Sequence, residues 1–160
     1  ATAYEIDFEK DGIVYEDERV KVEAFRTRHA ALENTFAYRF TTSDRVVVFT
    51  GDGGPYNANI VRASRNADIL VTETVTEDNI KYAPWGGESV EDKKRTIFQF
   101  HFTPKILARI AREAKVETIV LSHEQNYNQD EGYDALGLVE EVKSAGFEGD
   151  VFSAMDGDIY

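Results

Sequence analysis

Four side chains in this sequence could act together in one reaction, namely three histidines and one aspartate. His29, His101 and His123 are the only histidines, and each lies next to the end of an expected strand or helix. Asp52 stands in a glycine-rich turn directly after an apolar run. Imidazole nitrogen and carboxylate oxygen are the donors that zinc prefers where no thiolate is available, and the chain has no cysteine. Taken singly, each histidine is better explained as a surface or hydrogen-bonded side chain. Their shared placement favours a metal-binding interpretation.

The turn around Asp52 follows the segment on which the rest of the chain depends. Residues 46–49, Val-Val-Val-Phe, are uniformly apolar and mostly β-branched, which is typical of a strand buried on both faces. Gly51, Gly53 and Gly54 allow a sharp reversal that would aim the Asp52 carboxylate off the end of the sheet. Open α/β sheets bind their ligands beyond the carboxyl ends of the strands. The alternative is that Asp52 only hydrogen-bonds its own turn.

The remaining pattern predicts an antiparallel meander followed by alternating strands and helices. Strands are expected at residues 4–8, 13–15, 20–25, 36–40, 46–49, 69–71, 118–122 and 151–153. Helices are expected at 56–64, from the Thr103-Pro104 pair onward, and at about 134–145. Residues 75–96 lack periodicity and predict a long loop, in which Trp85 either covers a site or packs against its own domain. Three modest helices are too few to cover both faces of the sheet.

The composition is that of one globular domain. The chain has 160 residues, of which 42% are hydrophobic and 30% are charged. No apolar run approaches the roughly 20 residues of a membrane helix, and no leader peptide is visible, so we expect no membrane partner and leave the compartment open. Thirty acidic against eighteen basic residues give a net charge of -12. A field of that sign repels phosphate backbones, so we expect no nucleic-acid partner.

Several segments, in the same order, resemble the second half of a metallo-β-lactamase-fold hydrolase of the ribonuclease Z and arylsulfatase-like branch. These segments are residues 28–29, 36–40, 46–52, 67–73, 101–104 and 120–123. The resemblance spans nearly the whole chain. It implies an α/β fold that forms half of a four-layered αββα sandwich, a mixed sheet with helices on one face, in which residues 1–160 are a single domain.

The resemblance also implies a site with two zinc ions. His29 would complete the ligands of the first ion, His123 those of the second, and Asp52 would bridge both and so take part in catalysis. His101 resembles the branch's catalytic histidine that is not a ligand, and it would give a proton to the leaving group or stabilise an oxyanion. Glu73 could hydrogen-bond to a metal ligand and orient it. The stronger expectation is that Glu73 is a solvated glutamate at the end of a strand.

The reaction implied is a metal-assisted hydrolysis. Two cations lower the pKa of a water held between them, so that hydroxide can attack a phosphorus or carbonyl centre near neutral pH. Since an acidic surface disfavours long nucleic acids, a small-molecule substrate is expected, namely a small ester, lactone or phosphodiester.

One diagnostic part of the family does not occur in these residues: the H-x-H-x-D-H motif of the N-terminal half. The residues implied here supply one ligand for each metal ion and one carboxylate shared by both. An open zinc site takes three protein ligands, so this chain alone supplies too few. The chain is therefore a fragment, one subunit of a split enzyme, or a non-catalytic half-domain that acts as a binding or structural module. Each alternative predicts an apolar sheet face that needs a partner, either the N-terminal half of the same fold or a second copy of the chain.

Overall fold

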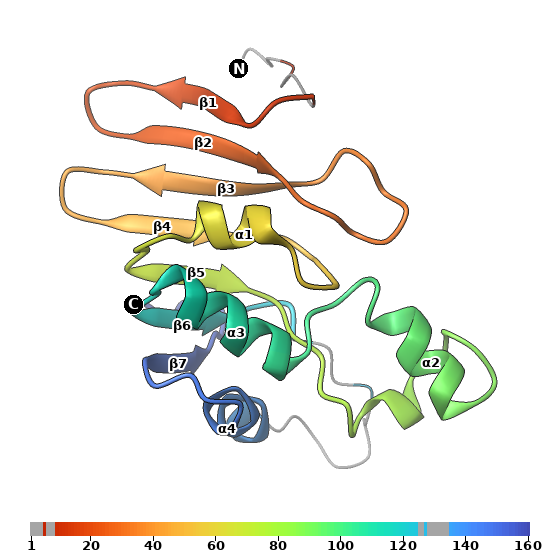
Figure 1. Cartoon of the computed structure of the whole chain (residues 1–160). Coiled ribbons are helices and arrows are strands. Elements are labelled where there is room, and N and C mark those ends of the chain that lie inside the picture. Colours follow the sequence, from red (N-terminus) through yellow and green to blue (C-terminus); the bar gives the residue numbers. More distant parts are fainter. Residues whose placement is uncertain (1–4, 6–8, 125–126, 128–134) are drawn as a thin grey trace.

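Seven strands form one sheet in which the strands follow each other in chain order (Figure 1). The computed structural model describes residue 5, residues 9–124, residue 127 and residues 135–160. The strands are β1 Gly12–Glu16, β2 Lys21–Arg26, β3 Phe36–Thr41, β4 Val46–Phe49, β5 Ile69–Thr72, β6 Thr118–Leu121 and β7 Asp150–Ser153. The helices are α1 Ala58–Ala63, the 3-10 helix η1 Ile80–Tyr82, α2 Val90–Ile97, α3 Pro104–Ala114 and α4 Ala135–Ser144. The strand expected at 4–8 lies outside the described residues, except for residue 5.

The sheet changes from antiparallel to parallel at β4. Strands β1 to β4 pair antiparallel, as the meander pattern predicts, whereas β4 to β7 pair parallel. In the parallel part, Val48 pairs with Leu70, and Leu70 pairs with Ile119. Because parallel strands run in the same direction, the segments that follow β4, β5 and β6 all leave from the same edge of the sheet. That edge receives Asp52, Glu73 and His123.

The core lies between one face of the sheet and the helices α1, α3 and α4. Val48, Leu70 and Ile119 are fully buried on the sheet side, and Ile60 and Leu107 are buried on the helix side. Figure 1 shows α1 and α3 in front of the sheet, and α4 packs against α3 and β7. The predicted mixed sheet with helices on one face is confirmed.

The opposite face of the sheet carries large exposed side chains. Phe49 is 45% exposed and Phe152 is 43% exposed, and Phe49 contacts Phe40 edge to face at 5.6 Å between centroids. The prediction that residues 46–49 are buried on both faces is therefore wrong for the part of the chain that the structure describes. Burial follows from the layer that packs on a strand, and the helices described here supply that layer on one face only.

Helix α3 begins and ends as its sequence predicts. The Thr103 hydroxyl accepts a hydrogen bond from the backbone N–H of Ile106, and Pro104 occupies the first turn, where its missing N–H costs nothing. At the other end Lys115 adopts a left-handed backbone with φ of 58°, and its N–H donates to the Arg112 carbonyl. This helix fixes the direction from which the His101 segment reaches the sheet edge.

The segment 75–96 differs from the aperiodic loop that we expected. It contains η1 and all but the last residue of α2, and these helices pack around a second apolar cluster of Val75, Ile80, Ala83 and Ile97. In Figure 1, α2 stands apart from the sheet and from α1 and α3. An eight-residue helix spans barely two turns, so its apolar stripe is too short to be recognised in sequence. Among the described residues, the structure contains no helix with the length and apolarity that crossing a membrane requires.

Candidate active site

Asp52 leaves the sheet in a turn whose backbone favours glycine. Gly51 has a φ of 61°, in the left-handed region. A Cβ on Gly54 would lie 2.7 Å from the carbonyl oxygen of His101 and 2.8 Å from that of Phe98. The turn thus packs directly against the backbone that precedes α3. The Asp52 carboxylate reaches outward from this turn, and its Oδ2 lies 3.4 Å from Nε2 of His123.

His123 follows β6 with a φ of 54°, a left-handed conformation that is uncommon for residues other than glycine. Such backbone strain persists only where the surrounding structure holds it, and it is concentrated at functional sites. His123 and Asp52 come from the loops at the carboxyl ends of β6 and β4, which lie on either side of β5 in the sheet. The pair supports the predicted convergence of these two side chains at one sheet edge.

His29 lies between β2 and β3 and is oriented by a backbone carbonyl. Its Nδ1 lies 2.9 Å from the carbonyl oxygen of Phe100. A carbonyl oxygen can only accept, so Nδ1 carries the proton, which leaves the lone pair of the imidazole on Nε2. A hydrogen bond of this kind is what commonly sets the orientation and tautomer of a metal-binding histidine. The backbone of His29 also pairs with Gly54, beside the Asp52 turn.

Glu73 is buried, and three donors converge on its carboxylate. Oε1 accepts from the backbone N–H groups of Gly53 at 3.2 Å and Phe102 at 2.8 Å, and Oε2 accepts from Nδ1 of His101 at 3.2 Å. Glu73 is 2% exposed and His101 is 6% exposed. The expectation of a solvated glutamate is wrong, because the Asp52 turn and the segment before α3 close over the end of β5.

The charge on Glu73 is governed by two opposing effects. Burial raises the pKa of the Glu73 carboxyl, and the hydrogen bonds from His101, Phe102 and Gly53 act in the opposite direction. An ionised Glu73 carboxylate can only accept from His101, so in that state the imidazole carries a proton on Nδ1 and presents Nε2 as the atom that can exchange a proton. An acid–base role for His101 is thus compatible with its surroundings.

Buried threonines link the strand ends behind the site. The hydroxyls of Thr50 and Thr72 lie 3.0 Å apart, and the Thr74 hydroxyl donates to the Phe102 carbonyl over 3.0 Å. Sequence reasoning did not single out these residues. A threonine that follows a strand carries no local signal of burial, so the sequence offered nothing that could have identified them.

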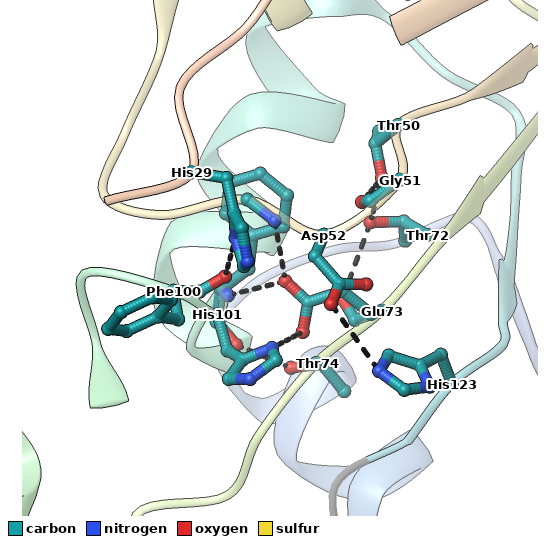
Figure 2. Close-up of polar contacts among 12 residues, drawn as sticks. His29, Thr50, Gly51, Asp52, Thr72, Glu73, Thr74, Phe100, His101 and His123 are labelled. Atoms are coloured by element: carbon teal, nitrogen blue, oxygen red, sulfur yellow. Dashed lines mark hydrogen bonds and ion pairs between the residues drawn. The ribbon is translucent and has the colours of Figure 1, made fainter. Parts of the chain in front are cut away.

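The predicted site residues come together at this edge. The ring centroids of His29 and His101 lie 6.1 Å apart, and those of His101 and His123 lie 6.3 Å apart. Figure 2 shows His29, Asp52, His101 and His123 around the buried Glu73 carboxylate. The donor types suit zinc. However, no group of three or more His, Asp or Glu side chains among the described residues is arranged to hold a metal ion. The ligand roles remain predictions.

The chain matches the family model described as the beta-lactamase superfamily domain over residues 2–123. It is 36% identical over 100 residues to ribonuclease Z of Archaeoglobus fulgidus, a match that covers 62% of this chain and 27% of that protein. It is 32% identical over 113 residues to ribonuclease Z of Haloferax volcanii, which covers 71% of this chain and 30% of that protein. The chain thus spans less than a third of the length of these curated relatives.

The fold is also found among solved structures. The metallo-beta-lactamase fold protein YhfI from Bacillus subtilis superimposes with a TM-score of 0.66 at 22% identity, covering 92% of this chain and 52% of that protein.

These comparisons correct one expectation. Both curated relatives are ribonucleases by name, which contradicts the expectation of a small-molecule substrate and no nucleic-acid partner. The net charge of -12 was a poor guide to the substrate, because it is a sum over the whole chain and says nothing about the charge at the site. A bound metal ion can be the largest charge of a site, and a count of amino acids omits it.

Proposed function

This chain belongs to the metallo-β-lactamase superfamily, in its ribonuclease Z-like branch, and from that premise we propose that it forms part of a zinc-dependent hydrolase that cleaves phosphodiester bonds of RNA. The observation that carries the proposal lies at one edge of the sheet, where Asp52 pairs with His123. The His101 ring, which Glu73 holds, is centred 6.1 Å from that of His29 and 6.3 Å from that of His123. These residues come from loops that are far apart in the sequence.

In this proposal His29, His123 and Asp52 would be the residues of this chain that hold the zinc ions, through imidazole nitrogens and a carboxylate. The hydrogen bond to Phe100 supports the role of His29, because it leaves the lone pair of Nε2 as the one that could bind a metal ion. When bound, the zinc ions supply Lewis acidity and lower the pKa of a water molecule.

His101 acts on the leaving group. Its Nδ1 is engaged by Glu73, so Nε2 is the atom that delivers a proton to the departing oxygen of the RNA strand. Glu73 is a positioning residue: it holds the imidazole in one orientation and stabilises the positive charge that His101 carries before it gives up the proton. General acid catalysis of this kind is typically worth about 10²- to 10⁴-fold in rate.

The remaining zinc ligands come from a segment outside these 160 residues. Two observations support this part of the proposal: the donors described here are too few for a catalytic zinc site, and one sheet face carries exposed Phe49 and Phe152. We assign to that face an N-terminal half of the same fold that contains the H-x-H-x-D-H motif.

Reconstitution tests the proposal. The chain is combined with a segment that carries H-x-H-x-D-H, loaded with zinc, and supplied with an RNA oligonucleotide. Cleavage is expected to require zinc and both segments, and His101→Ala is expected to lower turnover while leaving the zinc content unchanged. If RNA is not cleaved and both His29→Ala and Asp52→Ala leave the affinity between the segments unaltered, the chain is instead a non-catalytic half-domain that binds through its exposed sheet face.

A further inference from the structure

An exposed tryptophan lies next to the catalytic histidine of the proposed site. The indole ring of Trp85 is centred 6.5 Å from the imidazole of His101 and 5.7 Å from the ring of Phe100, and 38% of its surface remains exposed. His101 in turn lies 6.3 Å from His123. The indole therefore neighbours the ring that would donate the proton.

The segment that carries Trp85 is fixed on both sides. Ala83 is buried with Ile80 and Ile97 in the second apolar cluster. On the other side Gly86 has a φ of 97° and lies so close to α2 that a Cβ there would meet Lys93 Cα at 3.2 Å. Because both flanks are packed, the indole is held in one place and is not carried on a loose loop tip.

The same segment offers an aromatic surface and not a basic one. Lys94 pairs with Glu77 at 3.4 Å, and Arg95 pairs with Asp92. Residues 75–96 as a whole carry five acidic side chains against four basic ones, so the segment gives little net electrostatic attraction to a phosphate backbone. Stacking on an aromatic ring needs no such attraction, because every nucleobase has a π face. An exposed indole is thus a means of holding RNA that suits a chain with a net charge of -12.

We propose that Trp85 is a stacking platform for an unpaired base of the RNA, next to the phosphodiester bond on which His101 acts; the identity of this ligand rests on the proposed function. Phe100 and Tyr127 both lie nearly perpendicular to the indole, at 83°, and fix its orientation. Proteins that bind single-stranded RNA commonly stack splayed-out bases on aromatic side chains. Trp85 would thereby set the position of the strand relative to the Nε2 atom of His101.

Fluorescence offers a direct test, because Trp85 is the only tryptophan of the chain. The chain is titrated with a short oligoadenylate and, separately, with an abasic oligomer of the same length and charge. Quenching by the oligoadenylate alone is the expected result. Equal quenching by both oligomers, or quenching by neither, overturns the proposal.

Three variants separate stacking from packing. Trp85→Leu keeps apolar bulk but removes the π face, Trp85→Phe keeps a smaller ring, and Tyr82→Leu is the matched control. Tyr82 is another exposed aromatic of the same segment, and its ring lies over Lys81 Nζ at 4.8 Å. Measured by fluorescence anisotropy of a labelled oligoadenylate, affinity is expected to fall about tenfold to hundredfold in Trp85→Leu. It should fall less in Trp85→Phe and stay unchanged in Tyr82→Leu.

The cleavage assay distinguishes failure of this inference from failure of the proposed function. If the reconstituted, zinc-loaded protein cleaves RNA and Trp85→Leu keeps the wild-type KM, the stacking site is wrong and the hydrolase stands. If no RNA is cleaved but base-dependent quenching is observed, the hydrolase is wrong and Trp85 remains a nucleobase site. A KM that rises in Trp85→Leu with little change in kcat supports both.

Discussion

The carboxylate of Glu73 accepts a hydrogen bond from Nδ1 of His101 over 3.2 Å, and both side chains are buried. The other Glu73 oxygen accepts from the backbone of Gly53 and Phe102. One buried side chain thus connects the turn that carries Asp52, the segment before α3, and the proton on His101. The site depends on a residue that would itself contact neither metal nor substrate.

Replacing Glu73 by Gln should change the tautomer of His101. If the Gln oxygen keeps the two backbone donors, its NH₂ group faces Nδ1, so the imidazole must accept there and carry its proton on Nε2. Nitrogen NMR of the imidazoles reads this directly, and only three histidines need assignment. His29, whose Nδ1 donates to Phe100, is the internal control. An unchanged His101 tautomer would contradict the role given to Glu73.

Replacing Asp52 by Asn should weaken zinc binding without unfolding the protein. The amide keeps the shape of the side chain but removes the charge that a bridging ligand supplies. We expect zinc affinity, measured by calorimetry on the reconstituted protein, to fall at least roughly tenfold to hundredfold. His101→Ala should leave this affinity at the wild-type value. Loss of zinc in His101→Ala would make His101 a ligand, and normal affinity in Asp52→Asn would remove Asp52 from the metal site.

Adding a methyl group to Gly54 should destabilise the turn. The new Cβ would press on the backbone oxygens of His101 and Phe98, which cannot rotate away. Overpacking of this kind costs about 1–3 kcal/mol of unfolding free energy. Gly12→Ala, in the edge strand β1, is the control, because no atom lies within 4 Å of the added Cβ. Urea denaturation should show a lower midpoint for Gly54→Ala only; equal midpoints would mean that the turn can shift.

The buried Glu73 should give stability a recognisable pH dependence. Burial raises the pKa of this carboxyl above its ordinary value of 4.5, so the folded protein holds the proton more tightly than the unfolded chain. The contribution of Glu73 to the unfolding free energy is then largest below about pH 4.5 and falls as pH rises through the raised pKa. Denaturation of the wild type and of Glu73→Gln should be measured at a series of pH values from below pH 4.5 upward. The difference between their unfolding free energies should shrink as the pH rises. A growing difference would mean that the hydrogen bonds outweigh burial.

Much of the fold followed from local patterns. Turn residues and alternating apolar residues located β1 to β3, and the Thr103-Pro104 pair located the start of α3, because caps and turns depend on chemistry within a few residues. The helix α2 was missed, since eight mostly charged residues carry no long apolar stripe. Its position is set by the cluster around Ile97, which forms only when distant segments meet.

For the candidate site, too, one part was predictable from the sequence and another part was set only by the tertiary structure. Residue type and position next to the ends of strands and helices singled out His29, Asp52, His101 and His123, since parallel strands bring their carboxyl ends to one edge. The division of these residues into ligands and a proton donor came from the family resemblance and stays a prediction. The burial of Glu73 and the place of Trp85 beside His101 were not predictable from the sequence. Whether a carboxylate is solvated or caged depends on which other loops cover it, and that depends on the packing of segments far apart in the chain.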